Sequence, residues 1–223
     1  MNPIVVAAVS LLALINFRLL GGSRLVPIIH GAALQGALLA LVGIALRELD
    51  TAETALAVGT FLVKGFVLPT LLLRALRQVE IRREIEPLVG YNVSLLVGAA
   101  ALAIAAMLGG RIAEITTTHE PLMITISLFT MSTGLFLIVA RRKAVTQALG
   151  YLIFENGIYG LGIAVASGEP LLVEAGILLD LFVAVFVMGI IIFHIQHDFS
   201  HIDIDRLVVP DEVPETVREG DPS

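Results

Sequence analysis

Residues 122–166 read LMITISLFTMSTGLFLIVA, then RRK at 141–143, then AVTQALGYLIFENGIYGLGIAVA. Each apolar run has about the 20 residues that an α-helix needs to cross the hydrocarbon core of a membrane. Such runs form helices, because unpaired backbone groups are too costly in lipid. A basic triplet between them is typical of a loop at the membrane surface. The stretch therefore predicts two membrane-crossing helices, with Glu155 near the middle of the second.

The composition of the whole chain agrees with this interpretation. Of 223 residues, 57% are hydrophobic and 15% are charged, 20 are Gly, and the mean hydropathy is +0.93. Soluble globular domains are only about 45–50% apolar with Gly included, so these values exclude a water-soluble monomer and a disordered chain. The length is that of one polytopic membrane domain.

Seven long apolar runs are separated by short connectors that carry most of the charges. They lie at 3–20, 25–46, 53–73, 88–108, 122–140, 144–166 and 171–196. The predicted fold is all-α: a polytopic transmembrane helix bundle of about seven spans, forming one domain over 1–200. Residues 201–223, rich in Pro and charge, are predicted to be a cytoplasmic acidic tail. Since no basic region precedes the first run, we expect no N-terminal targeting peptide.

Basic residues are distributed unevenly between the two predicted membrane sides. One side receives nine Lys and Arg residues in loops and two in the tail, whereas the other receives Arg47 and Arg111. The nine are Arg18, Arg24, Arg74, Arg77, Arg82, Arg83, Arg141, Arg142 and Lys143. Because cytoplasmic loops are enriched in Lys and Arg, we expect an outside N-terminus and a cytoplasmic C-terminus. The membrane would be the cytoplasmic (inner) membrane of a prokaryote.

The chain contains no Cys, which excludes thiolate-bound iron–sulfur clusters and zinc sites as well as disulfides. Phosphate-cradling, dinucleotide and metalloprotease motifs are also missing from the sequence. The basic residues flank membrane spans, so they do not indicate nucleic-acid binding. No catalytic residue and no cofactor or metal is expected in this chain.

Two charged residues lie near the middle of predicted spans, Lys64 in 53–73 and Glu155 in 144–166. Each costs at least about 2.5–3.5 kcal/mol at a helix centre, so both should face protein or a hydrated path. Pro69 follows Lys64 and predicts a kink. The glycines around Glu155 would allow close helix approach. Either charge could serve an ion path or be held in a static pair, with a partner in this chain or another.

The last predicted span adds Glu174 and Asp180, and its cytoplasmic end adds His194. Glu174 could simply reach interfacial water, whereas Asp180 and His194 could line one stripe. His194, His197, Asp198 and His201 could also be interpreted as a metal site, but their position near a helix C-terminus has a simpler electrostatic explanation. His30, near the start of 25–46, is interpreted as a buried hydrogen-bonding residue rather than a proton relay. Together these residues form the candidate ion path: Glu155, Lys64, Asp180, Glu174, His30 and His194.

Four sequence features in a fixed order carry a resemblance to known proteins. They are RRK at 141–143, GYLIFENG at 150–157, ILLDLFVAVFVMG at 177–189 and HIDIDRL at 201–207. The second half resembles the K subunit of respiratory complex I over about 129–207, with its membrane part ending near 200. The whole chain is similar to the hydrogenase-4 component E family.

That resemblance implies a membrane-arm subunit of a group 4 [NiFe]-hydrogenase or formate hydrogenlyase type complex. Its partners would be antiporter-like membrane subunits and peripheral hydrogenase-type subunits, which would hold the [NiFe] centre and the iron–sulfur clusters. This chain would contribute part of a proton or ion path. Glu155 falls one helical turn later than the family's carboxylate, and Asp180 falls more than one turn earlier. A structural scaffold and a Mrp-type antiporter subunit remain the alternative functions.

Overall fold

The computed structural model describes residues 3–46, 51–78, 88–116, 121–141 and 144–165, together with Gly189. These residues are almost entirely helical and contain no strand. The helices are α1 (Pro3–Gly21), α2 (Leu25–Leu46), α3 (Thr51–Leu62), the π-helical turn η1 (Val63–Val67), α4 (Leu68–Gln78), α5 (Tyr91–Thr116), α6 (Pro121–Ala140) and α7 (Ala144–Val165).

Four helices are long and apolar enough to cross a membrane, and Val5–Gly21 is a shorter apolar helix. A membrane-embedded helix bundle is therefore the architecture of the described residues. The total of seven spans stays a prediction, and the span at 171–196 and the tail at 201–223 lie outside the described residues.

The helix boundaries agree with the predicted spans except at two places. Helix α5 continues to Thr116, past the predicted end at 108, because Gly109 and Ala113 are buried and extend its packed face. Arg111 therefore lies on the helix and not in a loop. Helix α4 continues to Gln78 instead of ending at 73, so Arg74 and Arg77 are also helical.

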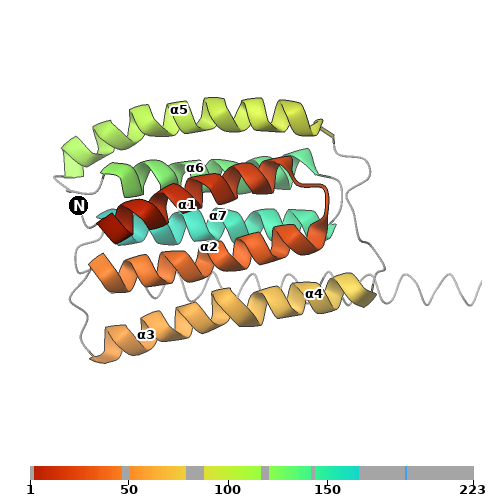
Figure 1. The fold of residues 1–223 in the computed structure, drawn as a ribbon, viewed down its shortest axis with the longest axis horizontal. Coiled ribbons are helices and arrows are strands. Elements are labelled where there is room, and N and C mark those ends of the chain that lie inside the picture. Colours follow the sequence, from red (N-terminus) through yellow and green to blue (C-terminus); the bar gives the residue numbers. More distant parts are fainter. Residues whose placement is uncertain are drawn as a thin grey trace, which may run out of the picture.

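Helices α3 and α4 form one rod that is interrupted at its centre by η1 (Figure 1). The N–H of Leu68 donates to the carbonyl of Val63, five residues earlier, which is the π-helical pattern. Pro69 follows directly. Proline has no N–H to give the carbonyl four residues before it and clashes with that carbonyl, so the local pattern is widened there. The kink predicted around Lys64 is thus a π-helical turn.

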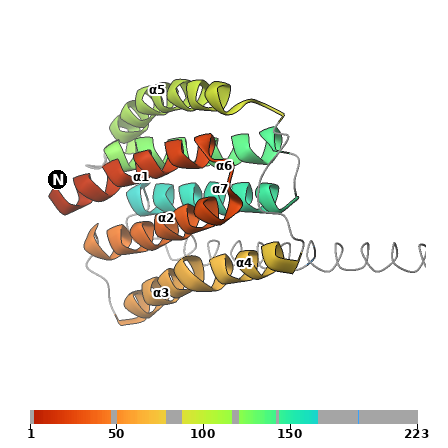
Figure 2. The same cartoon turned by 45° about the vertical axis from the view of Figure 1, so that its right-hand side comes forward.

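The rods run alternately in opposite directions along the bundle (Figures 1 and 2). As a result, the α1–α2 turn, the end of α4, the start of α5 and the α6–α7 connection gather at one end. That end carries Arg18, Arg24, Arg74, Arg77 and Arg141, whereas Arg111 lies toward the other end. The described basic residues that the sequence assigned to one side of the membrane thus lie at one end of the bundle, and Arg111, assigned to the other side, lies toward the opposite end.

Three apolar clusters pack the described helices, and the two larger ones occupy opposite halves of the bundle. The cluster in the basic half joins α1, α2, α4, α6 and α7 through residues such as Leu19, Leu72 and Leu149. The cluster in the opposite half joins α1, α2, α5, α6 and α7 through residues such as Leu12 and Met123. Some buried polar side chains, among them Gln35, Lys64 and Glu155, lie near the middle of the bundle, whereas others, such as Arg141, lie at helix ends.

Helices α6 and α7 form the closest pair of the bundle, and glycines allow it. A Cβ on Gly134 would lie 2.6 Å from the Gly150 carbonyl oxygen, and a Cβ on Gly157 would lie 2.6 Å from the Met131 nitrogen. Real Cβ atoms do not approach backbone that closely, so both positions require glycine. The close helix approach predicted from glycines around Glu155 is confirmed, and it holds the backbone of α7 firmly at that residue.

Arg141 lies at the basic end of the bundle, as predicted, but its side chain is only 1% exposed. Its guanidinium donates to the carbonyl oxygens of Leu20, at 3.0 Å, and Val89, at 3.3 Å. It also lies 4.8 Å from the centre of the Tyr91 ring. Arginine presents several donors in a rigid plane, so this one side chain joins the ends of α1, α5 and α6.

Candidate functional site

An ion pair lies at the centre of the bundle and joins the broken rod to α7. The Nζ atom of Lys64 is 2.5 Å from Oε1 of Glu155, and both side chains are 1% exposed. Lys64 lies within η1, and Glu155 lies near the midpoint of α7. The structure thus buries both charges within protein, as their insertion cost predicts, and makes each the other's partner.

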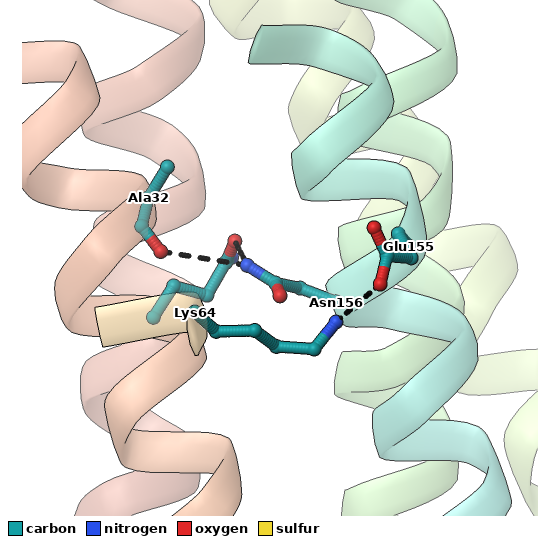
Figure 3. Close-up of polar contacts among 5 residues, drawn as sticks. Ala32, Lys64, Glu155 and Asn156 are labelled. Atoms are coloured by element: carbon teal, nitrogen blue, oxygen red, sulfur yellow. Dashed lines mark hydrogen bonds and ion pairs between the residues drawn. The ribbon is translucent and has the colours of Figure 1, made fainter. Parts of the chain in front are cut away.

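The position of the pair depends on a glycine of α2. A Cβ on Gly36 would lie 2.9 Å from the Cβ of Lys64 and 3.5 Å from Oδ1 of Asn156. Because that space is open, the Lys64 side chain crosses α2 and runs past Asn156 to reach Glu155 (Figure 3). Three elements therefore meet at Gly36: α2, η1 and α7.

A chain of buried amides extends from this pair across the bundle. Asn156 on α7 donates from Nδ2 to Oε1 of Gln35 on α2, at 3.4 Å. Gln35 donates from Nε2 to Oδ1 of Asn16 on α1, at 3.0 Å. Asn16 donates from Nδ2 to Oγ1 of Thr130 on α6, at 2.8 Å. All four side chains are at most 1% exposed, so the chain forms a polar layer at mid-depth.

Other groups complete the surroundings of the pair. Nζ of Lys64 is 5.5 Å from the centre of the Tyr159 ring, within the range of a cation–π contact. Asn156 also donates to the Ala32 carbonyl oxygen, at 3.4 Å (Figure 3). Its own side-chain oxygen, Oδ1, is buried and accepts no hydrogen bond from the described residues. A buried acceptor left in this way costs about 1–3 kcal/mol.

Of the six candidate ion-path residues, the structure brings two together and separates a third from them. Lys64 and Glu155 form the pair. His30, predicted to be a buried hydrogen-bonding residue, is exposed on α2 and lies on the side of the helix turned away from the core. Its neighbours Ile29 and Gly31 are buried instead, because the helix places successive residues on different faces. Glu174, Asp180 and His194 lie outside the described residues.

The amide chain and the buried arginine were not predicted. Gln35 and Asn156 lie near the middle of apolar spans, as Lys64 and Glu155 do, and uncharged polar residues at that depth are also costly to bury unpaired. Their position in the middle of an apolar span was therefore the signal that could have identified them as residues with buried polar partners. Asn16 and Thr130 had the same signal, with Asn16 about one turn nearer to the basic end of α1.

The described residues contain no group of three or more His, Cys, Asp and Glu side chains that could hold a metal ion. The four residues 194, 197, 198 and 201 lie outside them. The groups that meet at the pair are an ammonium, a carboxylate, the Tyr159 phenol and a line of amides, and such groups can hold charge and exchange protons.

Comparison with known proteins places the chain in a family. It is 33% identical over 187 residues to Uncharacterized protein Rv0085 of Mycobacterium tuberculosis, a match that covers 81% of this chain and 83% of the relative. The chain belongs to the Rv0085 family. No family model matches the chain, and no solved structure matches it. The name of the Rv0085 relative assigns no activity, so the functional argument rests on the site.

Proposed function

We propose that this chain is a membrane-arm subunit of an energy-converting redox complex of the [NiFe]-hydrogenase type, related to complex I. In this proposal Lys64 and Glu155 form part of a proton or ion path. The observation that carries it is the Lys64–Glu155 ion pair, buried at the middle of the bundle with Lys64 on a π-helical turn. Ionisable residues at that depth mark ion and proton pathways in membrane proteins.

The π-helical turn in the α3–α4 rod adds weight to a transport role. At Lys64 it replaces α-helical hydrogen bonds by bonds to the residue five positions earlier, and π-turns occur frequently at functional sites. The glycine contacts of α6 and α7 fix the backbone at Glu155. One charge thus stands on a π-helical turn and the other on a helix that packs closely against its neighbour.

The pair can change charge during a transport cycle. When Glu155 takes up a proton, its carboxyl becomes neutral and Lys64 remains positive, so the net charge of the pair rises from zero to plus one. Release of that proton restores the ion pair. Since a single buried charge is much more costly than a pair, protonation of Glu155 must be coupled to movement of another charge or of Lys64 itself.

Redox chemistry would take place in other subunits. These 223 residues contain no Cys and cannot supply the thiolates that bind iron–sulfur clusters. The [NiFe] centre and the clusters would belong to peripheral hydrogenase-type subunits, with antiporter-like subunits beside this chain in the membrane. The K-subunit-like part, about 129–200, would begin within the α6–α7 pair. The basic end of the bundle would face the cytoplasm of a prokaryote, with the N-terminus outside.

The test uses the assembled complex in proteoliposomes. Glu155→Gln should leave complex assembly and redox turnover intact but abolish the proton or sodium transport coupled to turnover. Glu114→Gln, which changes an exposed carboxylate on α5, is the matched control and should transport normally. Equal transport per turnover in Glu155→Gln and wild type would overturn the proposed role of the pair.

The partners provide a second test. The tagged chain, purified from its native membrane in mild detergent, should bring with it a hydrogenase-type large subunit. Recovery of a stable complex with antiporter-like subunits and no redox subunit would replace this proposal with the Mrp-type antiporter alternative.

A scaffold role is the other candidate, and one observation favours it. The ion pair and the amide chain together join α1, α2, α6, α7 and η1, so they could serve only to fix helix packing. Under that hypothesis, every variant that loses coupled transport would also lose assembly. An assembled but uncoupled variant would exclude it.

A further inference from the structure

The hydrogen bonds of the buried amide chain all point the same way. Asn156 donates to Gln35, Gln35 donates to Asn16, and Asn16 donates to Thr130. Each amide therefore donates to the next residue along the chain toward Thr130, and its oxygen lies at the opposite end of the amide. Hydrogen bonds aligned in a chain polarise one another, so the chain has a negative end, and that end is Oδ1 of Asn156.

This negative end lies within reach of the Lys64 side chain. Oδ1 of Asn156 and the Cβ of Lys64 both lie within 3.5 Å of one point, the position of a Cβ on Gly36. Figure 3 shows the Lys64 side chain running beside Asn156 on its way to Glu155. A lysine side chain that starts at this Cβ is long enough to place its ammonium on either oxygen. Oδ1 of Asn156 has no donor among the described residues.

We propose that Lys64 has two positions: paired with Glu155, as in this structure, and hydrogen-bonded to Oδ1 of Asn156 at the head of the amide chain. The second position is taken when Glu155 is protonated. Asn156 is then a positioning residue for the lysine, and Gln35, Asn16 and Thr130 act through it. Because it concerns the transport cycle, this inference rests on the proposed function.

The charges balance in each position. A proton taken up by the Glu155 carboxylate neutralises it, no bond to the Lys64 nitrogen is made or broken, and the ammonium keeps its three hydrogens. Its lost ionic partner is replaced by an amide oxygen whose partial charge is strengthened by the aligned amides behind it. Ion–dipole contacts of this kind stabilise charge in low dielectric, where an ammonium without acceptors is very costly.

Few other titratable groups of the described residues lie near the pair. The titratable groups on α7 near the pair are Tyr151, Tyr159 and Glu155, and the Tyr159 ring attracts a cation. Helix α6 contains no ionisable residue, and the one on α2, His30, is exposed. Lys64 lies on the π-helical turn η1, whereas both of its acceptors, Oε1 of Glu155 and Oδ1 of Asn156, lie on α7. The two positions therefore differ in the direction of the Lys64 side chain.

The closing experiment has a structural arm and a transport arm, both on the assembled complex. A cryo-EM structure of Glu155→Gln should show Nζ of Lys64 at hydrogen-bond distance, about 2.8–3.2 Å, from Oδ1 of Asn156. Nζ remaining on position 155, or bound elsewhere, would overturn the second position. This structural result does not depend on transport activity, so it tests the second position of Lys64 even if the proposed function is wrong.

In the transport arm, Asn156→Leu removes the acceptor and leaves the Lys64–Glu155 pair in place. Coupled transport should fall at least tenfold while assembly and redox turnover persist. Asn92→Leu, an exposed asparagine on α5, is the control and should transport normally. Wild-type transport in Asn156→Leu would overturn the inference, even where Glu155→Gln confirms the role of the carboxylate.

If Asn156→Leu does not assemble, Asn156→Asp provides the decision. A carboxylate at position 156 should draw Lys64 away from Glu155 in the cryo-EM structure and hold it there, which would stop coupled transport. Lys64 still paired with Glu155 in that variant would contradict the proposal.

Discussion

Gly36→Ala perturbs the site with a single methyl group placed where α2, η1 and α7 meet. An alanine in an open helix position is favoured over glycine by about 1 kcal/mol. At Gly36, however, the new Cβ would lie 2.9 Å from the Cβ of Lys64. Overpacking of this kind costs about 1–3 kcal/mol. The two terms together predict a net loss of about 1 kcal/mol in the free energy of unfolding.

Gly110→Ala is the matched control, because a Cβ there meets no atom within 4 Å. It lies in the interior of α5 and should leave the free energy of unfolding unchanged or raise it by up to about 1 kcal/mol. The two variants should therefore differ in sign. The assay is denaturant unfolding of the purified protein in detergent micelles, followed by far-UV circular dichroism.

The displaced lysine should also be visible in function. The methyl group that Gly36→Ala introduces pushes against the start of the Lys64 side chain. Coupled transport should therefore fall in Gly36→Ala and not in Gly110→Ala. If Gly36→Ala is as stable as Gly110→Ala and transports like wild type, the packing argument at this meeting point is refuted.

Three further changes test other parts of the structure. Arg141→Lys should lower the free energy of unfolding by about 2 kcal/mol, since a lysine cannot reach the Leu20 and Val89 carbonyls together and stack on Tyr91; denaturant titration measures it. Gly134→Ala should prevent stable α6–α7 packing, because its Cβ would strike the backbone of α7, and it should be recovered from membranes in reduced amount. Asn16→Leu should lower the free energy of unfolding by about 1–3 kcal/mol, because it leaves the Gln35 amide donor buried without its acceptor. Denaturant titration measures this change as well.

Each of these has a result that would count against it. Arg141→Lys within error of wild type would mean that the junction of α1, α5 and α6 does not depend on the guanidinium. Normal yield and stability of Gly134→Ala would show that the two helices can separate without loss. Asn16→Leu at wild-type stability would show that the amide chain contributes nothing to the fold.

The helices were largely predictable because each is a long apolar run, and lipid allows only one secondary structure for such a run. α2 has the predicted bounds, and α1, α6 and α7 agree within two residues. The ends of α4 and α5 were not predictable from apolarity. Both helices continue through charged residues that remain compatible with a helix once neighbouring residues are packed.

The two charges at the centre were also predictable, since a mid-span ionisable residue must be satisfied inside protein. Their pairing was left open, because Lys64 and Glu155 are 91 residues apart and sequence does not tell which helices are neighbours. The amide chain, which joins four helices, could not be predicted for the same reason: the sequence does not show which helices are neighbours. This lack of information also led to the wrong assignment of His30 as buried, and it concealed the burial of the Arg141 side chain. Whether a residue near a helix end is buried depends on whether its side of the helix faces other helices or the outside of the bundle.

The central claim, that the Lys64–Glu155 pair serves transport and not only packing, is tested most directly by removing both charges at once. Replacing a buried ion pair by neutral side chains of similar size is often close to neutral for stability, whereas removing one partner costs about 3–5 kcal/mol. The measurement is proton or sodium transport per redox turnover in the assembled Lys64→Met/Glu155→Gln complex. The pair as an ion path predicts an assembled complex that turns over without coupled transport. Transport at the wild-type ratio in that complex would contradict it.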